Sequence, residues 1–474
     1  MSPPEVRTAV ADTSEEIPTA LDALLLRIAK RTATVGVMGL GYVGLPLALA
    51  CAEVFQRAIG FDVNLERIVE VNDDCATQKN FSGTADFALL RDCDVVVICV
   101  PTPLEKSKNP DLSYIRDAAD RIAAHLRPGQ IVILESTSYP GTTDELLLPH
   151  FEGTGLTLDR DFYLAFSPER VDPGNTMPLR SIPKVIGGCS TGSALAAHEF
   201  YAGLVDVVHP VSNARAAETV KLLENTFRLV NIGLINEFAV LCNHLGIDST
   251  EVIAAAATKP FGFLPFFPGP GAGGHCIPLD PLYLNWKAKQ QGVVSRFIEL
   301  ADDINTKMPA YVVDLVARAL NDDSKSVRDA RILIVGVAYK NNVADTRQSP
   351  AIAIIDRLRY QGAIVNYHDP LIPLLDFDLD GWPEWRPRLK IATERRSLHV
   401  VAQSFPPRRR RYDMLHSVAL DAGMLAAADC VLILSKHDDV DYCAIGQQAR
   451  VVIDTRDALS LDMRTNARAR IIHL

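Results

Sequence analysis

Residues 34–50 read Thr34-Val-Gly-Val-Met-Gly39-Leu-Gly-Tyr-Val-Gly44-Leu-Pro-Leu-Ala-Leu-Ala50. The stretch begins with an apolar run typical of a buried parallel strand and ends with a helical pattern. Between them, the glycines have the GxGxxG spacing in the strand–turn–helix context that this motif requires. Such glycines allow a tight turn and bring helix N–H groups to a pyrophosphate. The stretch predicts a parallel α/β domain with a dinucleotide site formed by Gly39, Gly41, Tyr42, Val43 and Gly44.

An acidic residue in the expected place supports this interpretation. A second strand, 58–62, ends in Asp62, about 20 residues after the glycines. Its carboxylate can accept both ribose hydroxyls and repels a 2′-phosphate, so we expect NAD and not NADP. The alternative is a structural glycine turn followed by a chance aspartate. We expect Arg67 and Thr102 to complete the cofactor site.

Three further strands are expected in the first half of the chain, each followed by polar residues. The strands are 94–100, 130–135 and 162–166, and the polar residues are Pro101-Thr-Pro103, Ser136-Thr137 and Ser167-Pro-Glu-Arg170. Each polar group alone is typical of an ordinary cap or turn. Repeated along one sheet edge, they indicate a ligand site, because open α/β sheets bind ligands beyond the carboxyl ends of their strands.

A second glycine-rich stretch, Pro268-Gly-Pro-Gly-Ala-Gly-Gly-His-Cys-Ile-Pro-Leu-Asp280, contains Cys276. Pro278 suits the first turn of a new helix, which places Cys276 near a helix N-terminus that favours a thiolate. Asp280 lies one helical turn further on. The pattern indicates a nucleophilic cysteine on a loop, and the alternative is a cysteine that is merely packed.

A long helix is expected from about 213 to 246, with Lys221 and Asn225 on one face. The apolar neighbours Val220, Leu223 and Phe227 predict that this helix packs into the body of the protein. The alternative for Lys221 is a solvated surface lysine.

A second α/β unit begins at 331–340 with a strand that lacks the full glycine fingerprint. Further strands are expected at 363–367, 431–434 and 451–453. His437 and Arg456 follow the last two, where two basic groups can bind a diphosphate. The alternative is that both are ordinary surface charges.

The bulk composition limits the function classes. The 474 residues carry a net charge of −10, which argues against general nucleic-acid binding. The odd number of cysteines, nine, with no CxxC pair and no metal-ligand spacing, suggests reduced thiols in a cytoplasmic protein without a metal. The polar N-terminus does not read as a signal peptide, and no apolar run has the length of a membrane span.

These patterns predict four segments: a disordered N-terminus over 1–20, a Rossmann-like NAD domain over 21–212, a central helical domain over 213–320, and a second Rossmann-like domain over 321–474. We expect the central helices to form a homodimer or a higher homo-oligomer.

Taken together, the chain resembles the UDP-glucose/GDP-mannose dehydrogenase family over about Leu21 to Ala458. The resemblance rests on the ordered motifs GLGYVGLPLA, VPTPL, ESTSYPGTT, FSPERVDPG, AETVKLLENTFR, TKPFGFLPFFPGPGAGGHCIPLDP and VAYKNNVADTRQSP. It implies NAD-dependent oxidation of the carbon-6 alcohol of a nucleotide sugar to a carboxylate. The cysteine loop is most similar to that of the branch acting on UDP-N-acetylhexosamines, with UDP-N-acetylglucosamine as the expected substrate and UDP-glucose as the alternative.

The resemblance also implies residue roles. Cys276 is the implied catalytic thiol, surrounded by Lys221, Asn225 and Asp280, while Thr137 and Glu169 manage water and proton transfer. The implied cofactor contacts include Thr137 and Arg347. The implied substrate contacts are Glu169, Arg170, Lys221, Asn225, Gly273, Lys340 and Arg456.

Two segments depart from the family pattern. The chain between Arg67 and Thr84 is about 20 residues shorter than expected, and 382–412 is enlarged, judged against ordinary loop lengths.

Two rival functions stay open: a two-electron hydroxyacid-type dehydrogenase, which has no use for Cys276, and a nucleotide-sugar binding protein without catalysis.

Overall fold

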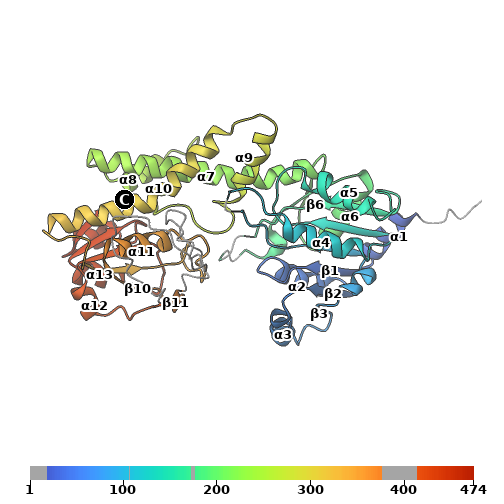
Figure 1. Ribbon diagram of the computed structural model, residues 1–474, viewed down its shortest axis with the longest axis horizontal. Helices are drawn as coiled ribbons and strands as arrows, with labels where there is room; N and C mark the ends of the chain where they lie inside the picture. The colour runs from blue at the N-terminus through green and yellow to red at the C-terminus, as the bar shows by residue number, and fades with distance from the viewer. Residues whose placement is uncertain (1–18, 106, 172–173, 175–176, 376–413) are drawn as a thin grey trace, which may run out of the picture. The chain divides into compact units, whose positions relative to one another are not determined.

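The glycine stretch folds as strand β1 (Thr34–Met38) followed by helix α2 (Gly44–Val54). The computed structural model describes residues 19–105, 107–171, 174, 177–375 and 414–474 (Figure 1). Contacts divide these residues into two units: those up to 171 together with 177–221, and residue 174 together with those from 222 onward. The boundary falls inside the long helix α7 (Ala214–Leu245), directly after Lys221.

The first unit contains an eight-stranded sheet in the order β3-β2-β1-β4-β5-β6-β7-β8. Neighbouring strands are parallel except β6 and β7, which pair antiparallel. The strands other than β1 are β2 (Arg57–Phe61), β3 (Phe81–Thr84), β4 (Val95–Ile98), β5 (Gln130–Leu134), β6 (Phe162–Phe166), β7 (Lys184–Gly188) and β8 (Val208–Pro210).

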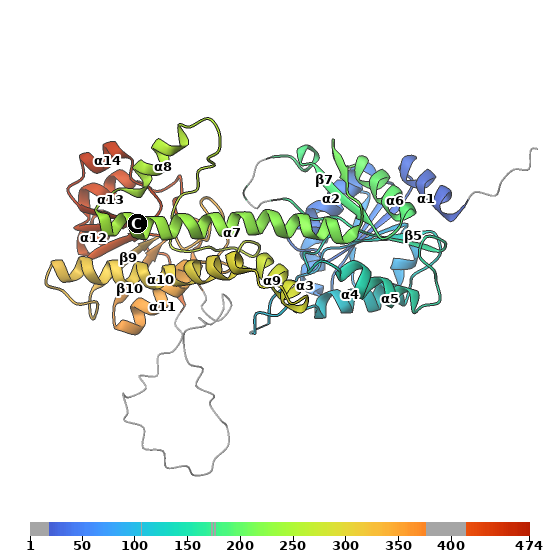
Figure 2. The same cartoon turned by 90° about the horizontal axis from the view of Figure 1, so that it is seen from above.

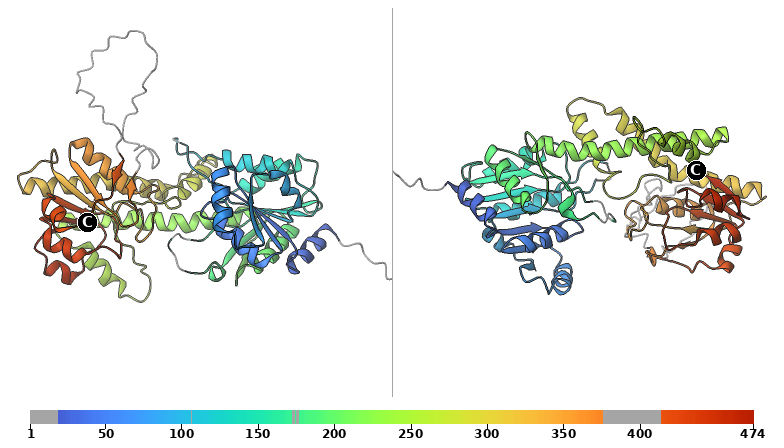
Figure 3. Two further views of the ribbon diagram at one scale, coloured as in Figure 1. Left: turned by 90° about the horizontal axis from the view of Figure 1, so that it is seen from below. Right: turned by 180° about the vertical axis from the view of Figure 1, so that it is seen from behind.

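Helices cover both faces of this sheet (Figure 3). The helical segments besides α2 are α1 (Ala20–Ala29), α3 (Leu65–Asp74), η1 (Phe87–Asp92), α4 (Ser113–Ala123), η2 (Thr142–Leu147), α5 (Leu148–Glu152), η3 (Leu179–Ser181) and α6 (Thr191–Ala202). Side chains of β1 alternate between the two cores: Val35 and Val37 pack with α1, α2 and α6, and Met38 packs on the opposite side with α4. Burial on both faces explains why the strands read as continuous apolar runs.

The order of the first six strands reverses direction between β1 and β4. In open α/β sheets, ligands bind beyond the carboxyl ends of the strands at such a reversal. The GxGxxG turn directly follows β1, so it lies at this point of the sheet.

The second unit contains a parallel five-stranded sheet in the order β10-β9-β13-β14-β15. Its strands are β9 (Arg331–Val335), β10 (Ile364–His368), β13 (Cys430–Ile433), β14 (Val451–Asp454) and β15 (Arg470–His473), and a separate antiparallel pair is formed by β11 (Leu374–Leu375) and β12 (Leu415–His416). Its helices besides α7 are α8 (Ser249–Ala257), α9 (Asp280–Gln290), α10 (Arg296–Asp322), α11 (Pro350–Gln361), α12 (Ala422–Ala427), α13 (Tyr442–Gln448) and α14 (Leu461–Thr465). Within this unit α10 runs beside α7 (Figure 2).

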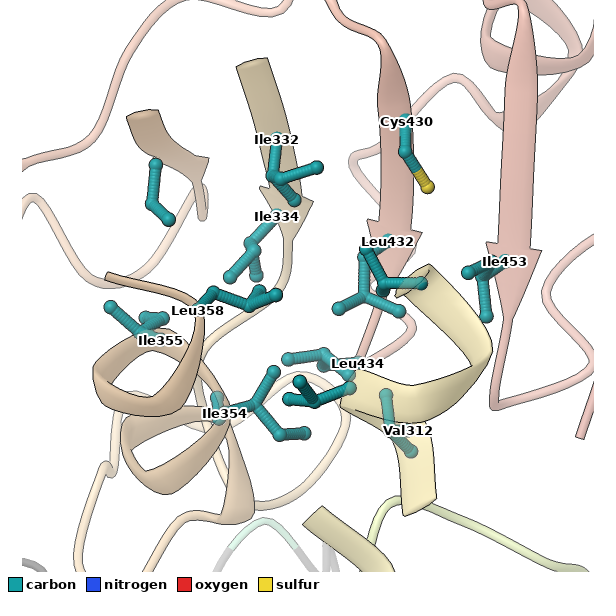
Figure 4. Packing of buried hydrophobic residues seen from close by; sticks show 14 of the residues in the cluster. Val312, Ile332, Ile334, Ile354, Ile355, Leu358, Cys430, Leu432, Leu434 and Ile453 are labelled. Carbon is teal, nitrogen blue, oxygen red and sulfur yellow. The ribbon is translucent and has the colours of Figure 1, made fainter. Parts of the chain in front are cut away.

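One face of the second sheet packs against α10 and α11 (Figure 4). Val312 of α10 and Ile354 and Leu358 of α11 meet Ile334 of β9 and Leu432 of β13 in one buried cluster. The opposite face is covered by α12 and α13. The second unit is therefore also an α/β layer structure with both sheet faces buried.

The parallel α/β architecture expected from the sequence is confirmed in both sheets, including the long helix. Two expectations were wrong in detail. Helix α9 begins at Asp280 with Pro281 in its first turn, so Pro278 lies in the preceding turn. Leu223 and Phe227 of α7 are exposed instead of packed into the body.

Two expectations, disorder in 1–18 and an enlarged segment at 382–412, concern parts of the chain outside the described residues. The segment from Arg67 to Thr84, expected to be short, still holds most of helix α3 and all of strand β3. Among the described residues, every helix is too short or too polar to cross a membrane.

Candidate active site

The three glycines of the first turn each meet a different steric demand. Gly39 has a φ of +92°, and a Cβ on it would lie 2.5 Å from the carbonyl oxygen of Cys99. A Cβ on Gly44 would lie 1.9 Å from the carbonyl oxygen of Gly39. Gly41 differs, because a Cβ there would meet no atom within 4 Å among the described residues. The open space at Gly41 fits the close approach of a pyrophosphate, which the first helix turn then binds through its N–H groups.

Asp62 stands at the end of β2 with both carboxylate oxygens beside this turn. Oδ2 accepts a hydrogen bond from the N–H of Leu40 at 2.9 Å, and Oδ1 accepts one from the N–H of Asn64 at 2.9 Å. The side chain is partly exposed, and each oxygen keeps a lone pair for a ribose hydroxyl. Arg67 donates from Nε to the carbonyl oxygen of Leu40 at 3.0 Å. These groups fit the ribose end of NAD.

The remaining predicted cofactor residues of the first unit lie at or near this sheet edge. Tyr42 is 47% exposed, and Val43 directly precedes α2. Thr102 is buried in the loop after β4, and Thr137 is partly buried after β5. The neighbouring residue Ser138 is also buried, and its Oγ has no hydrogen-bond partner among the described residues. The sequence analysis named Ser136 and Thr137 but not Ser138, because no local pattern distinguishes its hydroxyl.

Glu169 follows β6 and lies in a buried cluster of charges. Its Oε2 is 3.1 Å from Nζ of Lys184, and its Oε1 accepts the N–H of Arg170 at 2.7 Å. Burial raises the pKa of Glu169, but the ammonium of Lys184 and the main-chain hydrogen bonds outweigh burial and lower it to about 2. Nζ of Lys221 donates to the main-chain oxygen of Glu169 at 2.6 Å. The structure thus brings Glu169, Arg170 and Lys221 together within the first unit.

The cysteine loop belongs to the second unit. The N–H of Asp280 donates to the carbonyl oxygen of Cys276 at 2.9 Å, which closes one turn directly before α9. Nδ2 of Asn225 donates to Oδ2 of Asp280 at 2.6 Å, and both side chains are buried. Burial lowers the pKa of His275, the residue before the thiol, and Arg347 lowers it further.

The glycines of this loop are required by close packing on the segment after β9. A Cβ on Gly273 would lie 2.8 Å from Cβ of Tyr339, and a Cβ on Gly274 would lie 2.7 Å from the Tyr339 ring. The N–H of Gly274 donates to the carbonyl oxygen of Arg347 at 3.1 Å. At the start of the loop, the N–H of Gly269 donates to Oδ1 of Asn236 at 2.9 Å. The loop is therefore fixed to α7 and to the segment that follows β9.

Arg456 lies against the same loop. A Cβ on Gly269 would lie 2.5 Å from Nη1 of Arg456, whose Nε donates to the carbonyl oxygen of Leu434 at 2.9 Å. Burial lowers the pKa of Arg456 to about 10, which still leaves it positively charged near neutral pH. Lys340 is partly buried after β9, and Arg347 forms an ion pair with Asp345 at 2.6 Å. Arg456 and the cysteine loop thus share one region of the second unit.

The alternative that His437 is an ordinary surface charge was wrong, because His437 is buried, and its contact with a diphosphate stays a prediction. His437 is buried, its Nδ1 accepts the N–H of Asn342 at 3.0 Å, and its Nε2 lies 3.3 Å from Oδ2 of Asp369. Asp369 follows β10, the position that Asp62 occupies in the first sheet, but its Oδ2 also accepts the N–H groups of Val337 and Ala338. Nδ1 of His437 is thus occupied by the main chain, whereas Nε2 lies beside Asp369 without a hydrogen bond among the described residues.

Comparison with known proteins gives matches along most of the chain. Three models of the UDP-glucose/GDP-mannose dehydrogenase family match in order: the NAD binding domain over residues 33–205, the central domain over 215–307 and the UDP binding domain over 333–461. A UDP-N-acetyl-D-glucosamine 6-dehydrogenase of Pseudomonas aeruginosa is 38% identical over 356 residues, which cover 72% of this chain and 84% of that protein. The chain belongs to the UDP-glucose/GDP-mannose dehydrogenase family.

Other members of the family are similar over a greater length. A UDP-N-acetyl-D-mannosamine dehydrogenase of Methanococcus vannielii is 33% identical over 460 residues, 92% of this chain and 95% of the relative. Among solved structures, a UDP-D-ManNAc dehydrogenase from Pyrococcus horikoshii aligns with a TM-score of 0.77 and 31% identity, covering 93% of this chain and 99% of that one. The chain is thus a nucleotide-sugar dehydrogenase-family oxidoreductase with an NAD-binding domain, as the sequence predicted.

Proposed function

We propose that this family member oxidises the carbon-6 alcohol of a UDP-sugar to a carboxylate through a covalent intermediate on Cys276. The observation that carries the proposal is the turn from Cys276 to Asp280, which joins a partly exposed thiol through the main chain to a buried Asn225–Asp280 pair. A two-electron dehydrogenase has no use for such a thiol. Support for the sugar-nucleotide site comes from Arg456, a cation placed against the start of the same loop.

The proposed chemistry proceeds in three stages. The alcohol first loses a hydride and a proton to become an aldehyde, and the Cys276 thiolate adds to its carbon to form a thiohemiacetal. Loss of a second hydride and a proton gives a thioester. Water then attacks the thioester and releases the carboxylate and the free thiol. Each NAD supplies the acceptor for one hydride, so two NAD are consumed for each sugar.

Charged and polar side chains have separate roles in this proposal. Lys221 stabilises the oxyanion that develops on the sugar oxygen, and Asn225 shares this role. Asp280 orients Asn225 through their 2.6 Å hydrogen bond. Thr137 and Glu169 were expected to manage water and protons. A pKa of about 2 keeps Glu169 ionised, so we assign it to positioning and leave Thr137, with the buried hydroxyl of Ser138, as candidates to hold the attacking water.

The binding residues complete the proposal. On the cofactor side, NAD is bound by Gly39, Gly41, Tyr42, Val43, Gly44, Asp62, Arg67, Thr102, Thr137 and Arg347. On the substrate side, the UDP-sugar is bound by Glu169, Arg170, Lys221, Asn225, Gly273, Lys340 and Arg456. For the sugar we propose UDP-N-acetylglucosamine, because a relative with that named activity is 38% identical. UDP-N-acetylmannosamine and UDP-glucose are the alternatives.

Counting the NADH released per sugar consumed tests the proposal. A purified enzyme should release two NADH per UDP-sugar. A ratio of one would favour the two-electron dehydrogenase, and tight binding without NADH would favour the binding protein. A panel of the three UDP-sugars under the same conditions identifies the substrate by its kcat/KM.

We also propose the division at 21–212, 213–320 and 321–474 and a homodimer formed through the central helices. Support for the dimer comes from apolar side chains exposed along α7, which are Leu223, Phe227, Leu234, Leu241 and Leu245. Light scattering at working concentration tests this assembly, and a monomer would contradict it.

All nine cysteines are free thiols, which supports the expected cytoplasmic location, and cell fractionation tests it.

A further inference from the structure

Lys184, the first residue of β7, is a buried ammonium between two buried carboxylates. Its Nζ lies 3.0 Å from Oε2 of Glu135 and 3.1 Å from Oε2 of Glu169. The hydroxyl of Tyr201 donates to the other oxygen of Glu135. Lys184 is 3% exposed, so all of these charges are removed from water. Sequence reasoning did not single out Lys184, Glu135 or Tyr201.

A buried ion cluster of this kind contributes little to the stability of the folded state. Removing an ammonium and carboxylates from water costs several kcal/mol per ion, and apolar residues of similar volume are often equally stable or more stable. The pairing nevertheless keeps Lys184 charged: burial lowers the pKa of Lys184, but Glu135 and Glu169 outweigh burial and raise it. Packing therefore does not explain why a charged lysine is buried here, whereas its contacts point to a role in positioning.

Both carboxylate oxygens of Glu169 have partners within the first unit. Oε2 pairs with Lys184, while Oε1 accepts the N–H groups of both Arg170 and Val171. These bonds fix the backbone of the turn that begins at Glu169. The carbonyl oxygen of that same residue accepts the hydrogen bond from Nζ of Lys221 at 2.6 Å. A continuous chain of contacts therefore leads from Lys184 through Glu169 to Lys221.

We propose that Lys184 is a positioning residue, which holds Glu169 so that the carbonyl oxygen of Glu169 fixes the direction of the Lys221 ammonium. The inference rests on the proposed function insofar as Lys221 stabilises the oxyanion. Without Lys184, the Glu169 carboxylate loses its counter-ion, the turn relaxes, and Lys221 loses its fixed acceptor. A displacement of about 1 Å in a catalytic group can cost about 100-fold in rate.

The test is a double-mutant cycle between Lys184→Met and Lys221→Ala. Lys184→Met alone should lower kcat between about 10-fold and 100-fold and leave the KM for NAD within about 2-fold. In the Lys221→Ala background, Lys184→Met should change kcat by less than about 2-fold, because the two residues act as one unit. Equal effects of Lys184→Met in both backgrounds would overturn the inference, and so would an unchanged kcat.

Two variants serve as controls. Glu135→Gln changes the other partner of Lys184 but leaves the pair with Glu169, so kcat should stay within about 3-fold of the unmodified enzyme. Lys184→Arg keeps the charge and should recover part of the lost kcat. Thermal unfolding and NAD titration show whether Lys184→Met folds. If it does not, the double variant Lys184→Met/Glu135→Gln replaces it in the cycle, because only one unpaired carboxylate then stays buried.

A second measurement does not depend on turnover. The rate at which an amine-reactive reagent labels Lys221, followed by peptide mass spectrometry, reports how firmly its ammonium is held. Lys184→Met should raise this rate several-fold, and Glu135→Gln should not. An unchanged labelling rate would contradict the inference, whereas an unmodified enzyme that releases no NADH would contradict only the proposed function.

Discussion

Nδ2 of Asn225 donates a hydrogen bond to Oδ2 of Asp280 at 2.6 Å, and the N–H of Asp280 in turn binds the carbonyl oxygen of Cys276. Helix α7, the first turn of α9 and the cysteine loop are thus connected through one buried residue. Loss of the amide would remove a buried donor from the Asp280 carboxylate. Asn225 therefore supports both the local structure and the proposed chemistry.

Asn225→Ala should lower the free energy of unfolding by about 1–3 kcal/mol, because a buried acceptor loses a donor. Asn225→Asp should be more harmful above neutral pH, since it brings two carboxylates together. Urea unfolding at pH 6 and pH 8 measures both effects. If the stability difference between Asn225→Asp and the unmodified protein were the same at the two pH values, the buried contact would be contradicted.

Cys276→Ser should separate the two oxidations. The variant can still bind NAD and UDP-sugar, but a serine adduct is an ester that hydrolyses slowly, so net turnover should fall by at least about 100-fold. Steady-state NADH release and UDP-sugar titration give the two quantities, and mass spectrometry searches for a stalled ester. Near-normal turnover would eliminate the covalent mechanism.

Asp62→Ala should weaken NAD binding and reduce the preference of the enzyme for NAD over NADP. The reason is that the carboxylate that accepts the ribose hydroxyls also repels a 2′-phosphate. We expect the ratio of kcat/KM values for NAD and NADP to fall at least about 10-fold. Arg67→Ala is the comparison variant: it removes a neighbouring cation and should weaken both cofactors. Equal use of both cofactors by the unmodified enzyme would contradict the assignment.

The glycines of the first turn provide a matched pair of substitutions. Gly44→Ala places a Cβ against the carbonyl oxygen of Gly39, so it should destabilise the protein by several kcal/mol. Gly41→Ala meets open space, so it should fold normally but raise the KM for NAD at least about 10-fold. Thermal unfolding and steady-state kinetics distinguish the two effects. Unchanged NAD kinetics in Gly41→Ala would remove the pyrophosphate from this turn.

Glu218 provides a test of pH-dependent stability. Its carboxylate lies on α7, one turn before Lys221, and accepts the N–H and the hydroxyl of Thr143 and the N–H of Gly141. Burial nevertheless raises its pKa from 4.5 to about 7. The folded state then binds the proton more tightly than the unfolded state, so stability falls as pH rises from about 4.5 through about 7, by up to about 3 kcal/mol.

Glu218→Gln removes this titrating group, so its stability should fall less steeply between about pH 5 and pH 8. Burial also raises the pKa of Glu135 to about 7, which contributes a slope of the same sign in both proteins. The comparison of slopes by urea unfolding therefore isolates Glu218. Identical slopes would contradict the shift in its pKa.

The sequence predicted what depends on local pattern. The run from Thr34 to Ala50 predicted the first strand, turn and helix, because glycine spacing reports backbone sterics directly. It could not predict the antiparallel strand β7 or the role of Lys184, because a single lysine beside an apolar run says nothing about two distant carboxylates. His437 was placed correctly after its strand, but its partner Asp369 lies 68 positions earlier and is found only in the folded chain.

Asp369 sits where a parallel sheet of this kind presents an acid to a ribose, yet its oxygens already bind the main chain and His437. An inhibitor built on adenosine would therefore find an accessible carboxylate at Asp62 and a saturated one in the second sheet. Under the proposed function, selective inhibition is better pursued with uridine-like compounds directed at Arg456 and the cysteine loop. Compounds of that kind would not compete with the adenosine cofactors that many other dehydrogenases share.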